Sequence, residues 1–135
     1  MNKQDLKENI KARLEALTGW IAYDGNVQIT KVLPCIIYNI GHGDSLVRGR
    51  VDRNLEIQFW VDSNDNTLLD EKSDIVRKGK YSGNTLLEPG FDRSYGDEGE
   101  NVGFYNCFHD WEDYIDVDES NISRFDQRYI LHVYG

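Results

Sequence analysis

The sequence predicts a single α+β domain in which two helices cover one face of an antiparallel β-sheet. Apolar residues recur at helical spacing in two segments, one at the start of the chain and one in its middle. Two other segments, 51–61 and 123–134, alternate between apolar and polar residues as half-buried strands do. The chain has 135 residues, 39% of them hydrophobic and 29% charged, which suffices for one buried core over 1–135.

The first helix is predicted from Leu6 to Leu17. Asn2 is placed to cap its start and Gly19 to end it, since these residue types favour the two helix termini. The apolar stripe consists of Leu6, Ile10, Leu14 and Leu17.

Strand signals follow the first helix. Asp24-Gly25-Asn26 indicates a turn, after which we expect a brief strand at Val27–Ile29 and a longer one at Val32–Ile40. Pro34 has no N–H to donate, so it belongs at an edge or near the start of the longer strand. The segment Gly41-His42-Gly43-Asp44 is predicted to be a turn or loop.

A long strand and the second helix are predicted in the middle of the chain. Val51–Val61 alternates closely, and a helix is expected from about Thr67 to Lys78, capped by Asn64, Asp65 or Asn66. The residues expected on the buried side of the strand are Val51, Leu55, Ile57, Phe59 and Val61.

A long glycine-rich loop is expected after the second helix, at 79–103, with room for a hairpin. Connections this long are usually functional, so we interpret it as a partner-binding element. Deleting Ser82 to Asn101 is then expected to leave the subunit folded while abolishing assembly. The side chains expected to meet partners are Tyr81, Phe91, Arg93 and Tyr95 of this loop, with Trp60 and Trp111 elsewhere.

Two strands are expected to close the fold, at Gly103–His109 and Ser123–Tyr134. The acidic segment between them, Asp110–Glu119, is predicted to be a turn or a short extended piece. The sheet face away from the helices would carry Trp60, Ile130 and Tyr134, a mixture suited to contact with another subunit.

Negative charge is concentrated in one part of the chain. The formal charge is −9, and the segment from Glu88 to Glu119 holds eleven acids against Arg93 as its single base. Such a field repels phosphate backbones and attracts basic partners, which disfavours wrapping of nucleic acid. A cationic partner and a repulsive wall both fit this distribution.

Metal and cofactor sites are not expected. Asp62-Ser63-Asn64-Asp65-Asn66 begins like an EF-hand loop, but Thr67 and Ser73 stand where the glycine and the bidentate glutamate belong. Asp113, Asp116 and Asp118 are interpreted as a solvated or partner-facing strip. The three histidines lack the spacing of a zinc site.

Catalysis is not expected either. The sequence has no nucleophile elbow, phosphate-cradling glycine loop or dinucleotide fingerprint, so we predict that the protein is not an enzyme. Cys35 and Cys107 lie in apolar runs and are expected to be buried thiols. No apolar run has the length of a transmembrane helix, and the polar N-terminus argues against secretion.

Several segments together resemble the tail-terminator and head-to-tail joining (tail completion) proteins of long-tailed bacteriophages. They are the N-terminal helix Leu6–Leu17, the strand Pro34-Cys35-Ile36-Ile37-Tyr38, the strand and acidic helix start Leu55–Asp65, and the closing strand Ser123–Tyr134. The resemblance is one of pattern and size, and the stretch 79–103 is longer than the family pattern suggests.

The resemblance implies a virion structural protein made in the host bacterial cytoplasm. It implies a homohexameric ring that caps the tail tube, docks onto the head connector and lets DNA pass without specific binding. An acidic lumen would suit this role because it repels phosphates. The acids assigned to the lumen on this basis are Asp110, Glu112, Asp113, Asp116, Asp118 and Glu119.

Two competing interpretations remain open. A small enzyme with an acidic metal site would show an activity that chelators abolish. An acidic chain of this size also fits an inhibitor that imitates nucleic acid and blocks a basic host defence enzyme. Such a mimic would be monomeric or dimeric, whereas a tail terminator would form closed rings.

Overall fold

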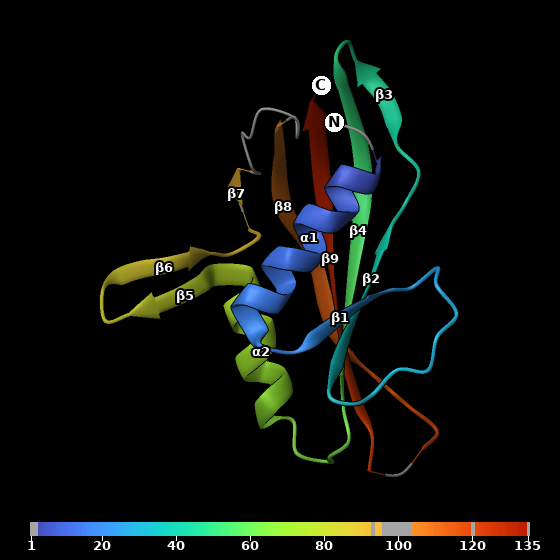
Figure 1. Cartoon of the computed structure of the whole chain (residues 1–135), viewed down its shortest axis with the longest axis vertical. Helices are drawn as coiled ribbons and strands as arrows, with labels where there is room; N and C mark the ends of the chain where they lie inside the picture. Colours follow the sequence, from blue (N-terminus) through green and yellow to red (C-terminus); the bar gives the residue numbers. More distant parts are fainter. Residues whose placement is uncertain (1–2, 93, 96–103, 120, 135) are drawn as a thin grey trace.

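The computed structural model describes residues 3–92, 94–95, 104–119 and 121–134. In this part the fold is α+β, with both helices on one face of a mostly antiparallel sheet (Figure 1). The elements are α1 (Lys3–Thr18), β1 (Ile21–Asp24), β2 (Cys35–Ile40), β3 (Asp44–Val47), β4 (Arg50–Val61), α2 (Thr67–Lys78), β5 (Gly79–Ser82), β6 (Thr85–Pro89), β7 (Ser94–Tyr95), β8 (Phe104–Ile115) and β9 (Ser123–Tyr134).

The main sheet has the strand order β1-β2-β4-β9-β8-β7, with β3 paired to β4. β1 runs parallel to β2, and every other described pair is antiparallel. β4 and β9 pair over their full lengths at the centre, from Arg50 opposite Tyr134 to Val61 opposite Ser123. β5 and β6 form a separate hairpin that projects beside the sheet (Figure 1).

The core lies between the helices and the sheet face that they cover. Directly paired residues share a face of the sheet, so Phe59, Ile36 and Phe125 form one row beneath the helices. The predicted stripe of α1 is buried, as is the predicted apolar side of β4 from Leu55 onward. The largest fully buried side chains are Tyr129, Phe59, Phe91, Leu6, Ile10, Leu14, Ile36, Leu55, Ile57, Leu69 and Leu131.

Helix boundaries agree with the sequence prediction. α1 ends where Gly19, at φ 72°, donates its N–H to the Glu15 carbonyl at 2.9 Å. α2 spans Thr67–Lys78 as expected, and its start is stabilised by the Asp65 carboxylate, which accepts the Thr67 N–H at 2.9 Å. The proposed cap Asn2 lies outside the described residues.

The strand prediction at Val27–Ile29 was wrong. Those residues follow the Asp24 turn as an exposed connection, and the strand lies earlier, at β1. The turn itself is present, because the Asn26 N–H bonds the Asp24 carboxylate at 3.0 Å. β2 begins one residue after Pro34, which confirms that this proline lies at the start of the strand. The peptide bond between Leu33 and Pro34 is cis.

The stretch 79–103 is not one long loop. Gly79–Ser82 and Thr85–Pro89 form the β5–β6 hairpin, and Ser94–Tyr95 adds β7 to the edge of β8. Gly83, at φ 59°, opens the two-residue turn of the hairpin, where only glycine adopts this backbone freely. Residues 93 and 96–103 lie outside the described part of the chain.

β8 is longer than predicted. The acidic segment expected to be a turn continues the strand as far as Ile115, with a bulge at Asp110, where the pairing with β9 shifts between His109 and Trp111. Residues 116–119 connect it toward β9. The bulge decides which way each acid of this segment points.

Candidate interaction surfaces

The sheet has one open face, which neither helix covers. Trp60, Ile130 and Tyr134 all lie on it, as the alternation of β4 and β9 predicts, because their neighbours along these strands are the side chains buried on the helix side: Phe59, Val61, Tyr129, Leu131 and Val133. We call this surface the open face. It combines aromatic and charged side chains in neighbouring rows, a composition typical of protein contact surfaces.

Two tryptophans of the open face are each capped by an arginine of β9. The Arg124 guanidinium lies 5.1 Å from the ring centroid of Trp60, and that of Arg128 lies 5.3 Å from Trp111. Arg124 is held in place by two bonds to the Asp126 carboxylate, at 2.7 and 2.6 Å, and that hydrogen bonding raises the pKa of Arg124. Trp60 and its arginine are therefore held in place before any partner binds.

Trp111 is half-exposed, at 40%, and Trp60 is partly buried. The Trp60 N–H donates to the Gln58 side chain at 3.0 Å, so its polar edge is satisfied within the subunit. Phe108 extends the same surface, with its ring 5.1 Å from that of His132. Aromatic and arginine side chains are those that most often carry binding energy at protein interfaces.

The six acids assigned to a lumen are all exposed, but the strand divides them. Asp113 pairs with Asp126 on the open face, whereas Glu112 pairs with Gln127 on the helix side. Asp110 is the bulged residue, and the other three lie in the β8–β9 connection. They therefore form a strip along one edge and end of the molecule, with Glu112 turned away from it.

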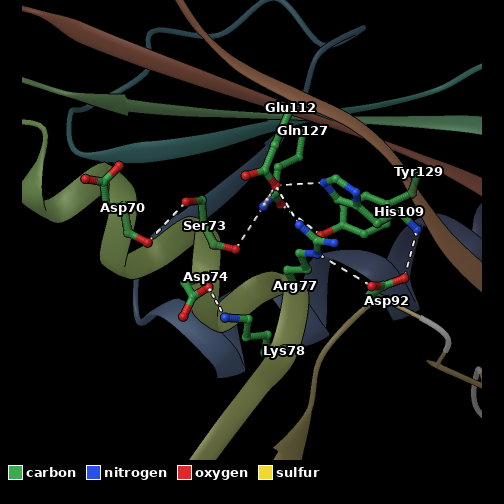
Figure 2. A network of polar contacts seen from close by, with 10 residues as sticks. All are labelled: Asp70, Ser73, Asp74, Arg77, Lys78, Asp92, His109, Glu112, Gln127 and Tyr129. Atoms are coloured by element: carbon green, nitrogen blue, oxygen red, sulfur yellow. Dashed lines mark hydrogen bonds and ion pairs between the residues drawn. The ribbon is translucent and has the colours of Figure 1, made fainter.

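Glu112 belongs to a network that ties β8 to α2 and to the segment after β6 (Figure 2). One of its oxygens lies 2.7 Å from His109 Nε2 and 3.7 Å from an Arg77 guanidinium nitrogen. Arg77 also approaches the Asp92 carboxylate, at 3.5 Å, and that carboxylate accepts the His109 backbone N–H at 3.0 Å. Glu112 thus links β8 to α2 within the subunit, and these contacts argue against a lumen role.

Gln127 extends this network into the core. It is almost fully buried, and its amide donates to the Ser73 carbonyl at 2.9 Å while accepting the Tyr129 hydroxyl at 2.9 Å. Burial raises the pKa of Tyr129 well above its ordinary value. A polar residue on the apolar side of β9 is the sequence signal that could have revealed this network.

A groove of about 430 Å³ runs between α2 and β8, lined by acids of α2, by Arg77 and by Tyr114. The Tyr114 hydroxyl donates to the Asp70 carboxylate, and this bond raises the pKa of Tyr114. Among the described residues, no group of three or more histidine, cysteine, aspartate or glutamate side chains is arranged to hold a metal. Cys35 and Cys107 are buried free thiols, as predicted.

Two of the loop residues predicted to meet partners have clear positions. Tyr81 is 55% exposed on the hairpin, but Phe91 is fully buried and is not a contact residue. Its ring lies 4.5 Å below the Arg13 guanidinium and 5.9 Å from Tyr129, and its N–H bonds the Val76 carbonyl at 2.8 Å. Tyr95 lies in β7, opposite Asn106. Arg93 lies outside the described residues.

Deletion of Ser82–Asn101 would remove Phe91, which is a core side chain, so tolerance of this deletion stays a prediction that the burial of Phe91 argues against. Within the described ranges, no helix is long and apolar enough to cross a membrane.

The comparisons with known proteins identify a shared fold. No family model and no curated protein matches the sequence. Among solved structures, the chain is similar to a chain of the "Virion of native gene transfer agent (GTA) particle", with a TM-score of 0.52, 18% identity, and coverage of 98% of this chain and 90% of that chain. The whole chain, and not a fragment of it, therefore has the fold of a chain found in a gene transfer agent virion.

Proposed function

We propose that this chain is a structural assembly protein of a phage-like virion, forming a ring that terminates the tail tube and joins it to the head connector. The observation that carries this proposal is the fold shared along nearly the full length with a chain of a gene transfer agent virion. A fold alone hosts many functions, so the surfaces of the chain must support the assignment.

The open face supports an assembly role. Its two arginine-capped tryptophans lie on an uncovered sheet, and aromatic and arginine side chains of this kind favour docking onto another protein. We assign the open face to the tail-tube or head-connector protein.

The acidic strip supports passage of DNA through a ring. Asp110, Asp113, Asp116, Asp118 and Glu119 are exposed. Carboxylates along a lumen repel phosphates and so prevent trapping of the moving strand. Glu112 is omitted from this set, because its contacts with Arg77 and His109 face the helix side.

Native mass spectrometry and negative-stain electron microscopy of the purified chain, alone and with its tail-tube protein, test the proposal. We expect closed homohexamers of the 15.7 kDa subunit, either free or formed on the tube end. Trp111→Ala should weaken binding to the tube, while Leu68→Ala, which removes a similarly exposed apolar side chain from α2, should not.

A chain that stays monomeric or dimeric with the tube protein present, and that instead binds a basic nucleic-acid enzyme, would overturn the proposal in favour of the nucleic-acid mimic. Binding of such an enzyme would then be competed by DNA and weakened by salt.

A further inference from the structure

The β5–β6 hairpin exposes apolar side chains that its own subunit does not cover. Every residue from Lys80 to Pro89 is exposed, and Tyr81, Leu86 and Leu87 are each about half accessible, at 55%, 49% and 53%. A two-stranded hairpin standing alone in water is marginally stable. Its apolar residues therefore favour a partner surface.

The base of the hairpin is fixed firmly to the body. Gly79 and Gly90 cross so closely that a Cβ on Gly90 would lie 2.4 Å from the Arg77 carbonyl oxygen. Arg13 of α1 donates to the carbonyls of Pro89 and Gly90, at 3.2 and 2.8 Å. The hairpin therefore leaves the body in a set direction, as a docking arm requires.

A matching apolar groove lies beside β1. It has a volume of about 310 Å³ and is lined by Ile21, Ala22, Tyr23, Val27, Ile29 and Tyr38, with Lys11 and Asp24 at its rim. Ile21, Val27 and Ile29 are about half exposed, and Val32 nearby is 65% exposed. Exposed apolar residues gathered in this way mark an interaction site.

The groove accepts side chains and not an added strand. The outward N–H and C=O of Ala22 already bond the Glu15 carboxylate, at 3.1 Å, and the Lys11 ammonium, at 2.9 Å. The Asp24 carbonyl likewise accepts the Val27 N–H, at 3.1 Å. Because these three outward groups of β1 are already bonded, an occupant of the groove would bind through apolar contacts.

The two surfaces also complement each other in charge. Glu88 follows Leu87 on the hairpin, and Lys31 lies between Ile29 and Val32 beside the groove. Lys31 contacts the carbonyls of Val27 and Ile29 at 3.5 and 3.4 Å, and within the described ranges neither Lys31 nor Glu88 has an oppositely charged side chain at ion-pair distance.

The β5–β6 hairpin projects on one side of the molecule, and the connection that follows β1 lies on the other (Figure 1). β1 is one end of the sheet, and the hairpin leads into β7 at the other end. A single subunit cannot bring them together, but two copies can. Contacts between different surfaces of identical subunits are head to tail, and they close into rings when the rotation permits.

We infer that the β5–β6 hairpin of one copy docks its leucines and Tyr81 into the groove beside β1 of the next copy, with Glu88 facing Lys31. This contact rests on the proposed ring and names the two surfaces that build it.

Charge variants on each side test the contact. The double variant Leu86→Asp with Leu87→Asp disrupts the apolar surface of the hairpin, and Val27→Asp with Ile29→Asp disrupts that of the groove. Asn84→Asp with Thr85→Asp, and Gln28→Asp with Thr30→Asp, are matched controls that add the same charge to exposed positions in the same segments. Native mass spectrometry measures assembly, and circular dichroism confirms folding.

The hairpin variant and the groove variant should each be monomeric. The subunit contact should weaken roughly 100-fold or more, because forming it would bury a carboxylate in an apolar site. The controls should assemble as wild type. A mixture of the hairpin variant and the groove variant should form heterodimers, because one intact hairpin still meets one intact groove. The mixture should form no rings.

The other outcomes separate the two proposals. If rings persist in both the hairpin variant and the groove variant, or if their mixture forms no heterodimers, the hairpin contact is overturned while the proposed ring stands. A hairpin variant that keeps its rings but loses the tail tube assigns the hairpin to the tube, which also overturns the inference. Heterodimers from the mixture, together with open filaments from wild type, support the contact and overturn the ring.

Discussion

Phe91 shows how local sequence can disguise a core residue. It is flanked by Gly90 and Asp92 in a stretch without periodicity, yet it is fully buried against Arg13 and Tyr129. Its burial depends on the chain returning from the hairpin to bond Val76 and Arg77 of α2. No pattern within ten neighbouring residues carries that tertiary information.

Removing the phenyl ring of Phe91 should therefore lower the stability of the fold. We expect Phe91→Ala to lower the free energy of unfolding by about 3–5 kcal/mol, as for other buried aromatic residues. Tyr81→Ala, on the exposed hairpin, should change it by about 0.5 kcal/mol or less. Urea denaturation of both variants measures the difference, and a Phe91→Ala protein as stable as wild type would contradict the core assignment.

Glu15 should make stability depend on acid pH. Burial alone would raise its pKa, but hydrogen bonds from Lys11 and from the Ala22 N–H lower the pKa below its usual value. A depressed folded-state pKa contributes stability that is complete above the unfolded-state pKa and is lost as pH falls through the folded-state pKa.

Wild type should accordingly lose more unfolding free energy than Glu15→Gln when the pH falls below about 4.5. Lys11→Met, which removes one partner, should reduce this difference. Urea denaturation at a series of pH values measures it, and parallel profiles for wild type and Glu15→Gln would refute the linkage.

Among the elements, long periodic segments were predictable and short or polar ones were not. α1, α2, β4 and β9 carry enough repeats to fix type and boundaries, and β9 was predicted residue for residue. β1 was missed because it has four residues, one of them buried, and depends on α1 to satisfy its edge. β8 was cut short because its acids lie on an exposed edge strand, where charge is compatible with a strand.

The glycine crossing at the base of the hairpin gives a prediction at this scale. A Cβ on Gly90 would meet backbone atoms of Arg77 and Gly79 at 2.4 and 2.5 Å, whereas a Cβ on Gly83 meets nothing within 4 Å. Gly90→Ala should cost more than about 2 kcal/mol through a forced backbone shift, and Gly83→Ala about 1 kcal/mol from its positive φ.

Thermal denaturation of the two glycine variants ranks them. If Gly83→Ala proved the more damaging, the close crossing would not be what fixes the hairpin.

At the scale of the whole molecule, the sequence indicated that acids are concentrated but not how they are divided. Alternation placed Trp60, Ile130 and Tyr134 on one face correctly, because a regular strand fixes the side of every residue. The bulge at Asp110 shifts the register of β8, so Glu112 faces the helices and joins Arg77. Contacts such as these join segments far apart in sequence, which periodicity does not encode.

Neutralising part of the acidic strip should change how an assembled ring treats DNA. Asp113→Asn, Asp116→Asn and Asp118→Asn together should raise DNA affinity about tenfold at low salt, and the effect should fade as salt rises. Neutralising Glu8, Asp62 and Glu71, which are equally exposed elsewhere, should have a smaller effect. Fluorescence anisotropy with labelled DNA measures both, and equal gains would place the strip outside the lumen.

The saturated backbone of β1 has a consequence for behaviour at high concentration. Lys11 and Glu15 occupy the outward groups of Ala22 at one end of the sheet, and acids follow the bulge of β8 at the other. Among the described residues of β1, the outward groups of Ala22 are thus not free to pair with a further strand. We therefore expect β1 to resist addition of a strand from a second copy when the protein is concentrated.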